Sequence, residues 1–128
     1  MKKPLLIIAG EPNSISSEII CKSWVLKKKF KFTPFIVLGS SEILQKQIKA
    51  LNYKIKLFEV DNISKTFKYF KKGIPVLNIN YKQKKPFEKV SKKSRNYLFK
   101  CFDKANNLVL NNKINGYINC PVSKDKFF

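Results

Sequence analysis

Histidine is absent from this 128-residue sequence, which also holds only 4 glycines, 3 cysteines and a single arginine. Without histidine the chain lacks the commonest metal ligand of proteins and the commonest general base. Three cysteines at wide, irregular spacing complete no four-ligand zinc site and match neither a disulfide framework nor a CxxC redox pair. These absences argue against metal-based and histidine-based catalysis by this chain, and the cysteines predict a reducing, cytoplasmic location.

Long uncharged hydrophobic runs are also missing. None approaches the ~20 residues that a membrane-spanning helix needs. The start of the chain imitates a signal peptide, with Lys2 and Lys3 before an apolar run, but Glu11 and Pro12 interrupt that run too early. We therefore expect neither export nor a membrane partner.

Acidic residues are few, 8 against 27 basic residues, which gives a net charge of +19. Such a charge is typical of nucleic-acid binding, yet base readout and phosphate clamps favour arginine, and Arg95 is the only one. Lysine, asparagine, isoleucine and phenylalanine, whose codons are rich in A and T, make up nearly half of the chain. We interpret the charge as a solvated surface and do not expect a nucleic-acid partner. The alternative, a small lysine-rich protein that binds nucleic acid or another polyanion, stays open.

The length and a hydrophobic content of 44% fit one domain at most. Along it, short apolar runs alternate with segments of helical periodicity. The runs predict strands at 4–10, 35–38, 55–60, 74–79 and 117–120, and the periodic segments predict helices over 14–29, 42–51, 63–72 and 91–111. Strands that are apolar on both faces indicate an α/β fold with a mostly parallel sheet and helices on both faces.

Local signals refine this prediction. Asn13 or Ser14 should cap the first helix, Asn52 should end the second in the left-handed conformation, and Gly73 should close the third. Lysines that alternate with apolar residues place strand 55–60 at an edge of the sheet, and 80–88 is expected to be an exposed loop. The strand at 117–120 should be buried and followed by a covering helix. Because the sequence stops at Phe128, we expect an incomplete, truncated domain.

Ligands of open α/β sheets collect at the carboxyl ends of the strands, where two turns stand out. The turn 10–18 offers helix N–H groups and small hydroxyls, which can hold an anion, and 119–124 brings a lysine to the same edge. The candidate anion-binding or substrate-proximal residues are Glu11, Asn13, Ser14, Ser16, Asn119 and Lys124. The simpler interpretation is an ordinary capping turn and one more exposed lysine. Cys120 has no histidine to activate it, so no catalytic residue is assigned.

The motif Gly-Glu-Pro-x-x-Ile-x-x-Glu from Gly10, and Cys-Pro-Val-Ser-Lys from Cys120, resemble the 4-hydroxythreonine-4-phosphate dehydrogenase family. The segment 116–119 and the helix that Ser91 opens also look like that family, and the match covers only the amino-terminal portion of a member. The resemblance implies an isocitrate/isopropylmalate dehydrogenase-like fold of which residues 1–128 are the amino-terminal part. It also implies an NAD-dependent oxidoreductase of pyridoxal 5′-phosphate biosynthesis, which oxidises a phosphorylated hydroxy amino acid. Members are homodimers that use a divalent metal held by three histidines.

None of those histidines can be carried over to this chain. We therefore expect the chain alone to bind neither NAD nor metal, to be inactive, and to be poorly soluble because apolar faces lack partners. The chain departs from the family at Asn13 and Ser14, where Ala-Gly is usual, at Ser16, where glycine is usual, and at Cys120, where glycine or threonine is usual. A side chain at Ser16 restricts the backbone where a ligand would approach. Completion by a separate subunit is a further possibility.

Overall fold

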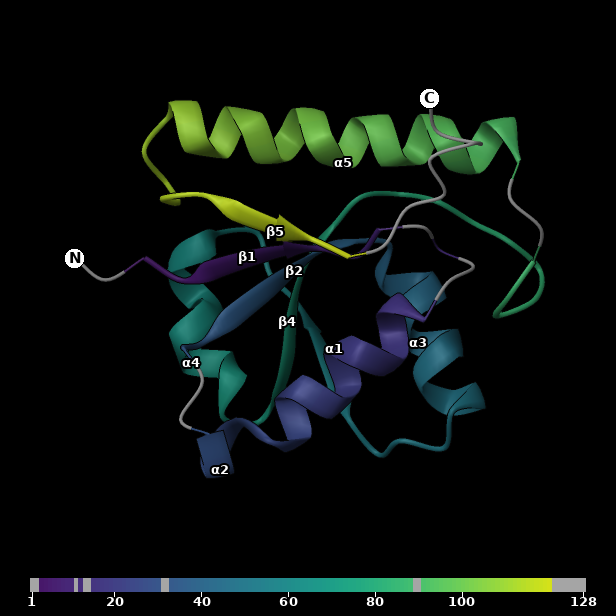
Figure 1. Ribbon diagram of the computed structural model, residues 1–128, viewed down its shortest axis with the longest axis horizontal. Helices are drawn as coiled ribbons and strands as arrows, with labels where there is room; N and C mark the ends of the chain where they lie inside the picture. Colours follow the sequence, from purple (N-terminus) through teal and green to yellow (C-terminus); the bar gives the residue numbers. More distant parts are fainter. Residues whose placement is uncertain (1–2, 11, 13–14, 31–32, 89–90, 121–128) are drawn as a thin grey trace.

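The computed structural model describes residues 3–10, 12, 15–30, 33–88 and 91–120. Within these residues strands and helices alternate, as the sequence predicts (Figure 1). Apart from a short 3-10 helix, η1, at Ile63–Lys65, the elements are β1 (Leu5–Ile8), α1 (Ser16–Val25), α2 (Lys27–Phe30), β2 (Phe35–Gly39), α3 (Ser41–Ala50), β3 (Lys56–Glu59), α4 (Thr66–Phe70), β4 (Gly73–Asn78), α5 (Lys92–Leu110) and β5 (Tyr117–Asn119).

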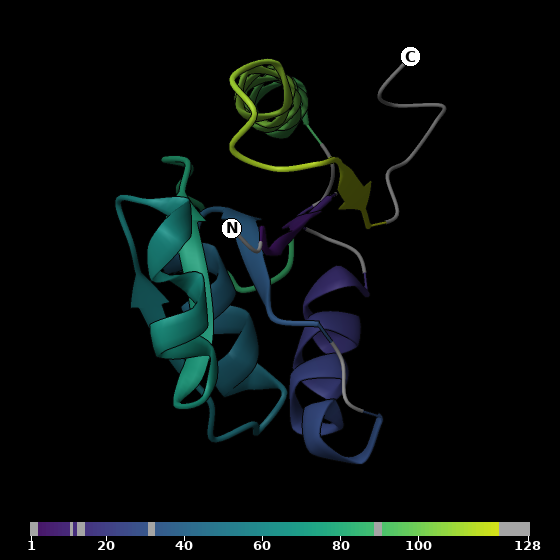
Figure 2. The same ribbon diagram turned by 90° about the vertical axis from the view of Figure 1, so that its left-hand side faces the viewer.

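The five strands form one parallel sheet in the order β3-β4-β2-β1-β5. The chain moves from β1 through β2 to β3 toward one edge, then returns through β4 to β5 at the other. Right-handed crossovers in opposite directions place the connecting helices on opposite faces. Figures 1 and 2 show α5 on one side of the sheet and α1 on the other. The predicted parallel sheet with helices on both faces is confirmed.

Two apolar clusters flank the sheet. On one face, Leu6, Ile8, Ile36 and Leu38 of the strands pack against α5, η1 and the segment after β4. On the other face, Val37 and Val76 are among the strand residues that pack against α1 and α3. Strands buried on both sides explain why their sequences are apolar without alternation.

The second and fourth predicted helices form as expected. Ser40 caps α3 by accepting a hydrogen bond from the Ile43 N–H, and Asn52 follows that helix with φ 62°. Ser91 caps α5 in a capping box with Ser94, with distances of 3.2 and 2.9 Å. Both helices therefore begin where a small hydroxyl residue satisfies free N–H groups.

The first helix differs from the prediction. It begins at Ser16 after Ile15, which provides no side-chain cap, and the predicted caps Asn13 and Ser14 lie outside the described residues. It is also interrupted at Leu26, so that α1 and α2 replace one long helix. Val25 and Leu26 are 53% and 39% exposed, so little packing holds the helix continuous at this point.

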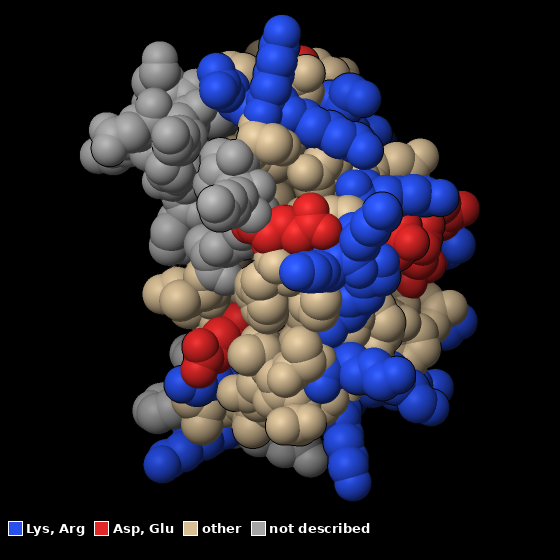
Figure 3. All heavy atoms as spheres, turned by 90° about the vertical axis from the view of Figure 1, so that its right-hand side faces the viewer, with Lys and Arg blue, Asp and Glu red and all other residues tan. Residues whose placement is uncertain are grey.

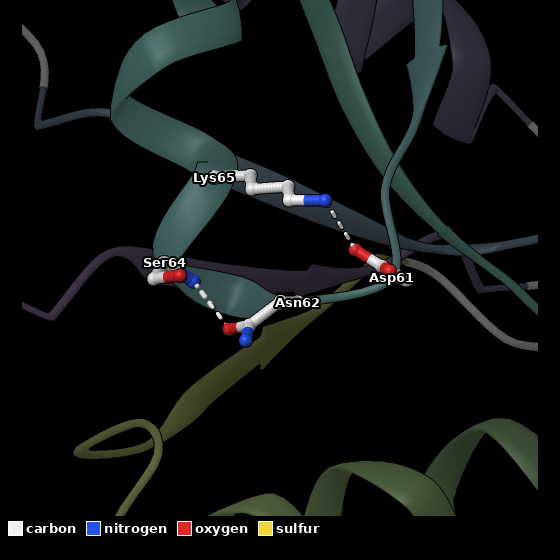
Figure 4. Close-up of polar contacts among 4 residues, drawn as sticks. All are labelled: Asp61, Asn62, Ser64 and Lys65. Atoms are coloured by element: carbon white, nitrogen blue, oxygen red, sulfur yellow. Dashed lines mark hydrogen bonds and ion pairs between the residues drawn. The ribbon is translucent and has the colours of Figure 1, made fainter.

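The third helix also differs from the prediction. After β3 the chain turns through η1, where the Asn62 side chain accepts from the Ser64 N–H and Lys65 pairs with Asp61 at 2.8 Å (Figure 4). Gly73 does not close the helix but begins β4. A Cβ atom there would lie 2.3 Å from the Lys56 carbonyl oxygen of edge strand β3. The close approach of two strands, not a helix end, requires this glycine.

Two burial predictions were only partly right. Most of the loop after β4 is exposed as predicted, but Tyr81 and Gln83 are buried, and the Tyr81 ring stacks on Tyr97 of α5 with centroids 4.8 Å apart. Strand β5 is partly exposed, with Ile118 at 53%, because it pairs with β1 alone and forms an edge among the described strands. The predicted edge position of β3 is confirmed.

Candidate functional site

The two turns singled out in the sequence begin at one corner of the sheet. Because β1 and β5 are parallel neighbours, Ile8 lies opposite Asn119, and the Cys120 N–H donates to the Ile8 carbonyl oxygen at 3.0 Å. Both strands end on the same side of the molecule (right in Figure 1). We call the ends of β1 and β5, together with the first turn of α1, the β1–β5 corner.

The turn after β1 depends on a glycine and on α3. Gly10 has φ 78°, a left-handed conformation that glycine adopts without strain. Two residues later, the Pro12 carbonyl oxygen accepts a hydrogen bond from the Gln47 side chain. The backbone that leaves β1 is therefore fixed from within the fold.

The first turn of α1 brings two hydroxyls to this corner. Ser16 and Ser17 are 4% and 2% exposed, and the Ser17 Oγ atom has no hydrogen-bond partner. A buried hydroxyl without a partner is unfavourable, and the positive end of the helix dipole lies beside it. Helix N–H groups next to a free hydroxyl suit a phosphate or carboxylate oxygen.

Ser16 lies close to the Cys120 thiol, near enough for its side chain to act on the pKa of that thiol. Burial raises the pKa of this thiol, and the nearby Ser16 hydroxyl offsets only part of the rise. The thiol therefore stays protonated at neutral pH and is no nucleophile. Ser16 and Cys120, two of the positions at which the chain departs from the family that it resembles, thus contact each other.

Of the six candidate residues, the structure describes two. Ser16 is buried against Cys120, and Asn119 is exposed at the end of β5, with its Nδ2 atom 3.4 Å from the Cys120 carbonyl oxygen. Glu11, Asn13, Ser14 and Lys124 lie outside the described residues. The assignment of an anion to these residues stays a prediction.

Gln47 was not among the sequence candidates. It is 3% exposed, and its Nε2 atom donates to the carbonyl oxygens of Pro12 and Pro86, the latter at 2.9 Å. One amide thus ties the turn after β1 to the loop after β4. A polar residue within the buried stripe of α3, one turn after Ile43 and Leu44, was the signal that could have revealed it.

Crossovers to opposite faces begin at the adjacent strands β2 and β4, where open α/β sheets also bind ligands. Here the fold closes this crevice with its own polar groups. The Ser41 N–H donates to the Asn78 Oδ1 atom at 2.9 Å, and the Ser40 N–H donates to the Tyr97 hydroxyl oxygen at 2.7 Å. The β1–β5 corner is therefore the better candidate.

The residues at hand do not fit a divalent metal. The chain has no histidine, and no group of three or more Cys, Asp or Glu side chains within the described ranges could hold an ion. The turn after β1 also lacks the glycine spacing of dinucleotide-binding loops. No helix in the described part of the chain is long and apolar enough to cross a membrane.

These features define an open parallel α/β protein with an anion-compatible corner at the carboxyl edge of its sheet. A family model described as pyridoxal phosphate biosynthetic protein PdxA matches residues 31–127. The chain therefore belongs to the PdxA family, which confirms the resemblance inferred from its motifs. This membership does not favour the alternative of a small polyanion-binding protein.

Two relatives and two solved structures carry the same name, 4-hydroxythreonine-4-phosphate dehydrogenase. The protein of Zymomonas mobilis is 26% identical over 126 residues, 98% of this chain and 36% of that protein. The protein of Caulobacter vibrioides is 24% identical over 122 residues, 95% of this chain and 35% of that protein. This chain therefore spans just over a third of the length of these relatives.

The solved structures support the fold. The crystal structure from Burkholderia phymatum superposes with a TM-score of 0.85 at 16% identity, covering 98% of this chain and 38% of that one. The crystal structure from Klebsiella pneumoniae gives 0.79 at 21% identity, covering 98% and 39%. The α/β arrangement described above is thus that of dehydrogenase structures.

Proposed function

We propose that this chain forms the amino-terminal part of an NAD-dependent dehydrogenase of pyridoxal 5′-phosphate biosynthesis. The substrate would be a phosphorylated hydroxy amino acid of the 4-hydroxythreonine 4-phosphate type. Membership of the PdxA family and the names of the relatives support this reaction class. The observation in the structure that supports the proposal most is that Ser16 of the first family motif and Cys120, which begins the second, lie together at the β1–β5 corner.

In this proposal the corner binds and orients substrate and performs no chemistry. The first turn of α1 and the Ser17 hydroxyl would receive an anionic group of the substrate, with Asn119 at the rim. Glu11, Asn13, Ser14 and Lys124 belong to the same two turns in sequence and complete the proposed set. Buried Ser16 would hold the two turns together through Cys120.

NAD, which accepts the hydride, and the divalent metal would be held by residues other than these. The chain has no histidine and spans 36% of its Zymomonas relative, so we propose that it is inactive alone. We further propose a homodimeric, cytoplasmic enzyme without a nucleic-acid partner. No step of the reaction is assigned to a side chain of this chain.

A chimera tests the proposal. Residues of this chain replace the matching amino-terminal part of the Zymomonas mobilis protein, and NADH formation is followed with 4-hydroxythreonine 4-phosphate, NAD and Mg²⁺. We expect turnover by the chimera and none by this chain alone. A chimera that melts cooperatively yet neither binds nor oxidises this substrate would contradict the proposal, and NADH formation by this chain alone would contradict its predicted inactivity.

The role of the corner is tested in the same chimera. Ser17→Ala should raise KM by about threefold to tenfold, because a hydrogen bond to an anionic group is lost. Ser64→Ala is the matched control, since Ser64 is exposed within η1, away from the corner. Equal KM values for the two variants would rule out substrate contact at Ser17.

A further inference from the structure

A hollow of about 550 Å³ lies between the start of α5 and the segment that follows β4. Its polar lining among the described residues consists of Lys82, Lys93, Lys100, Asn80 and Asn96 and includes no carboxylate. Two tyrosines, Tyr81 and Tyr97, complete the wall. We call this hollow the α5 pocket. Its size lies within the range of small-molecule sites.

Helical spacing explains why the lining residues of α5 face the same hollow. Lys93, Asn96 and Lys100 stand three and four positions apart on α5, which places them on one face of the helix. Lys82 and Asn80 come from the opposite wall, directly after β4 ends. Donor groups from two segments that are distant in sequence therefore face a common space.

The tyrosines hold these walls in place. The Tyr81 and Tyr97 rings stack with centroids 4.8 Å apart, and both side chains are at least nine-tenths buried. Ser40 joins them, because its N–H donates to the Tyr97 hydroxyl oxygen at 2.7 Å and its Oγ atom donates to the Tyr81 carbonyl oxygen at 2.8 Å. The pocket is thus preorganised by buried hydrogen bonds, which lowers the entropic cost of binding.

The charges in the α5 pocket are uncompensated. In the described part of the chain, the ion pairs Lys22–Glu18 and Lys65–Asp61 both lie elsewhere, and none of the three pocket lysines has a carboxylate partner. Figure 3 shows basic side chains gathered around α5 at the top of the molecule. Like charges around one hollow repel each other, so a bound anion would relieve that repulsion.

We propose that the α5 pocket binds a small ligand that carries two or more phosphate groups. Lysine ammonium groups bind phosphate as point charges, and the two asparagine amides can donate to the remaining oxygens. A short hollow with three cations on its walls suits a compact anion better than the extended backbone of a nucleic acid. This site follows β4 and is separate from the β1–β5 corner, so it is independent of the proposed dehydrogenase function.

Calorimetric titration of the 128-residue chain with pyrophosphate at physiological salt tests the proposal. The pocket variant carries Lys82→Gln, Lys93→Gln and Lys100→Gln, all at exposed positions. The control variant carries Lys49→Gln, Lys54→Gln and Lys72→Gln, which are also exposed and remove the same charge outside the pocket. We expect saturable binding by the parent and control chains, and binding weaker by roughly thirtyfold or more in the pocket variant.

The outcomes separate a pocket from a merely basic surface. Equal loss of binding in both variants, or no saturable binding by the parent chain, would overturn the proposal. Tighter binding of a single-stranded oligonucleotide than of pyrophosphate, lowered alike in both variants, would overturn it in favour of a diffuse nucleic-acid surface. Thermal melting of each variant checks that it is folded. A further single variant, Asn96→Leu, should also weaken pyrophosphate binding without changing any charge.

Discussion

Burial raises the pKa of individual cysteine thiols in this chain. Desolvation raises the pKa of Cys21 to about 11 and that of Cys101 to about 12. In the unfolded state a thiol has a pKa of about 8.5, so the folded state retains protons that the unfolded state loses at alkaline pH. The stability that this supplies is complete below the unfolded pKa and is lost as pH rises through the folded pKa.

We therefore expect the free energy of unfolding to fall between about pH 9 and 11, measured by urea denaturation at each pH. Cys101→Ala should flatten this decline, because it removes the thiol whose pKa lies higher than that of Cys21 in the folded state. Burial also raises the pKa of Tyr97, and Cys101 contributes to that rise, so the difference between the two slopes reports the Cys101 thiol together with its effect on Tyr97. Parallel pH profiles would refute this account.

The contact between Ser16 and Cys120 predicts a measurable coupling. Ser16→Ala and Cys120→Ala should each destabilise the chain, and the double variant should lose less than the sum, with a coupling of about 0.5–1 kcal/mol. Ser64→Ala combined with Cys120→Ala is the control and should be additive, because Ser64 is exposed within η1. Additivity in both pairs would show that the two departures from the family pattern do not stabilise each other.

At the scale of elements, glycine substitutions report how closely strands approach. Gly73→Ala should destabilise the chain by about 1–3 kcal/mol, because the new Cβ would lie 2.3 Å from the Lys56 carbonyl oxygen and push β3 from β4. Gly116→Ala is the matched control, since a Cβ there meets nothing within 4 Å. Chemical denaturation measures both variants. A stable Gly73 variant would mean that edge strand β3 yields without loss.

The elements that the sequence predicted best are those in which capping and periodicity agree. In α3, Ser40 starts the helix, Ile43, Leu44 and Ile48 face the core, and Asn52 ends it in the left-handed conformation. In α1 the apolar pattern was misleading, because Ile19 is 40% exposed. Helical periodicity indicates which residues share one face of a helix, but it does not indicate whether another element covers that face.

The candidate site was predictable only in part. Ligands of open α/β sheets bind at the carboxyl ends of the strands, and this rule identified the turns after β1 and β5. The parallel pairing of β1 and β5 places the starts of both turns side by side, as the rule predicts. The same rule did not identify Gln47 or the unpartnered Ser17 hydroxyl. Gln47 matters because it binds carbonyl groups that are distant in sequence, and Ser17 matters because its hydroxyl is buried in the folded chain. Gly73 was misjudged for the same reason, since its constraint comes from the neighbouring strand.

For the molecule as a whole, an apolar hollow of about 430 Å³ opens beside β5 and α1, lined in part by Ile7, Ile19, Ile118 and Phe35. Two of these side chains remain well exposed, Ile19 at 40% and Ile118 at 53%. Exposed apolar surface next to an open strand edge favours self-association, and the positive charge of the chain opposes it more weakly as salt rises.

We expect the chain to self-associate at high concentration, more strongly at high salt, as measured by sedimentation velocity. The double variant Ile19→Lys and Ile118→Lys should sediment as a monomer, because it places charges in the hollow that the association would bury. Leu110→Lys is the control: Leu110 is 78% exposed at the end of α5 and does not line the hollow, so association should persist. Since added positive charge alone would weaken association in both proteins, only a selective loss in the double variant identifies the β5–α1 hollow as the contact. A parent chain that stays monomeric at high salt would show that this surface is too small or too polar at its rim to hold a second copy.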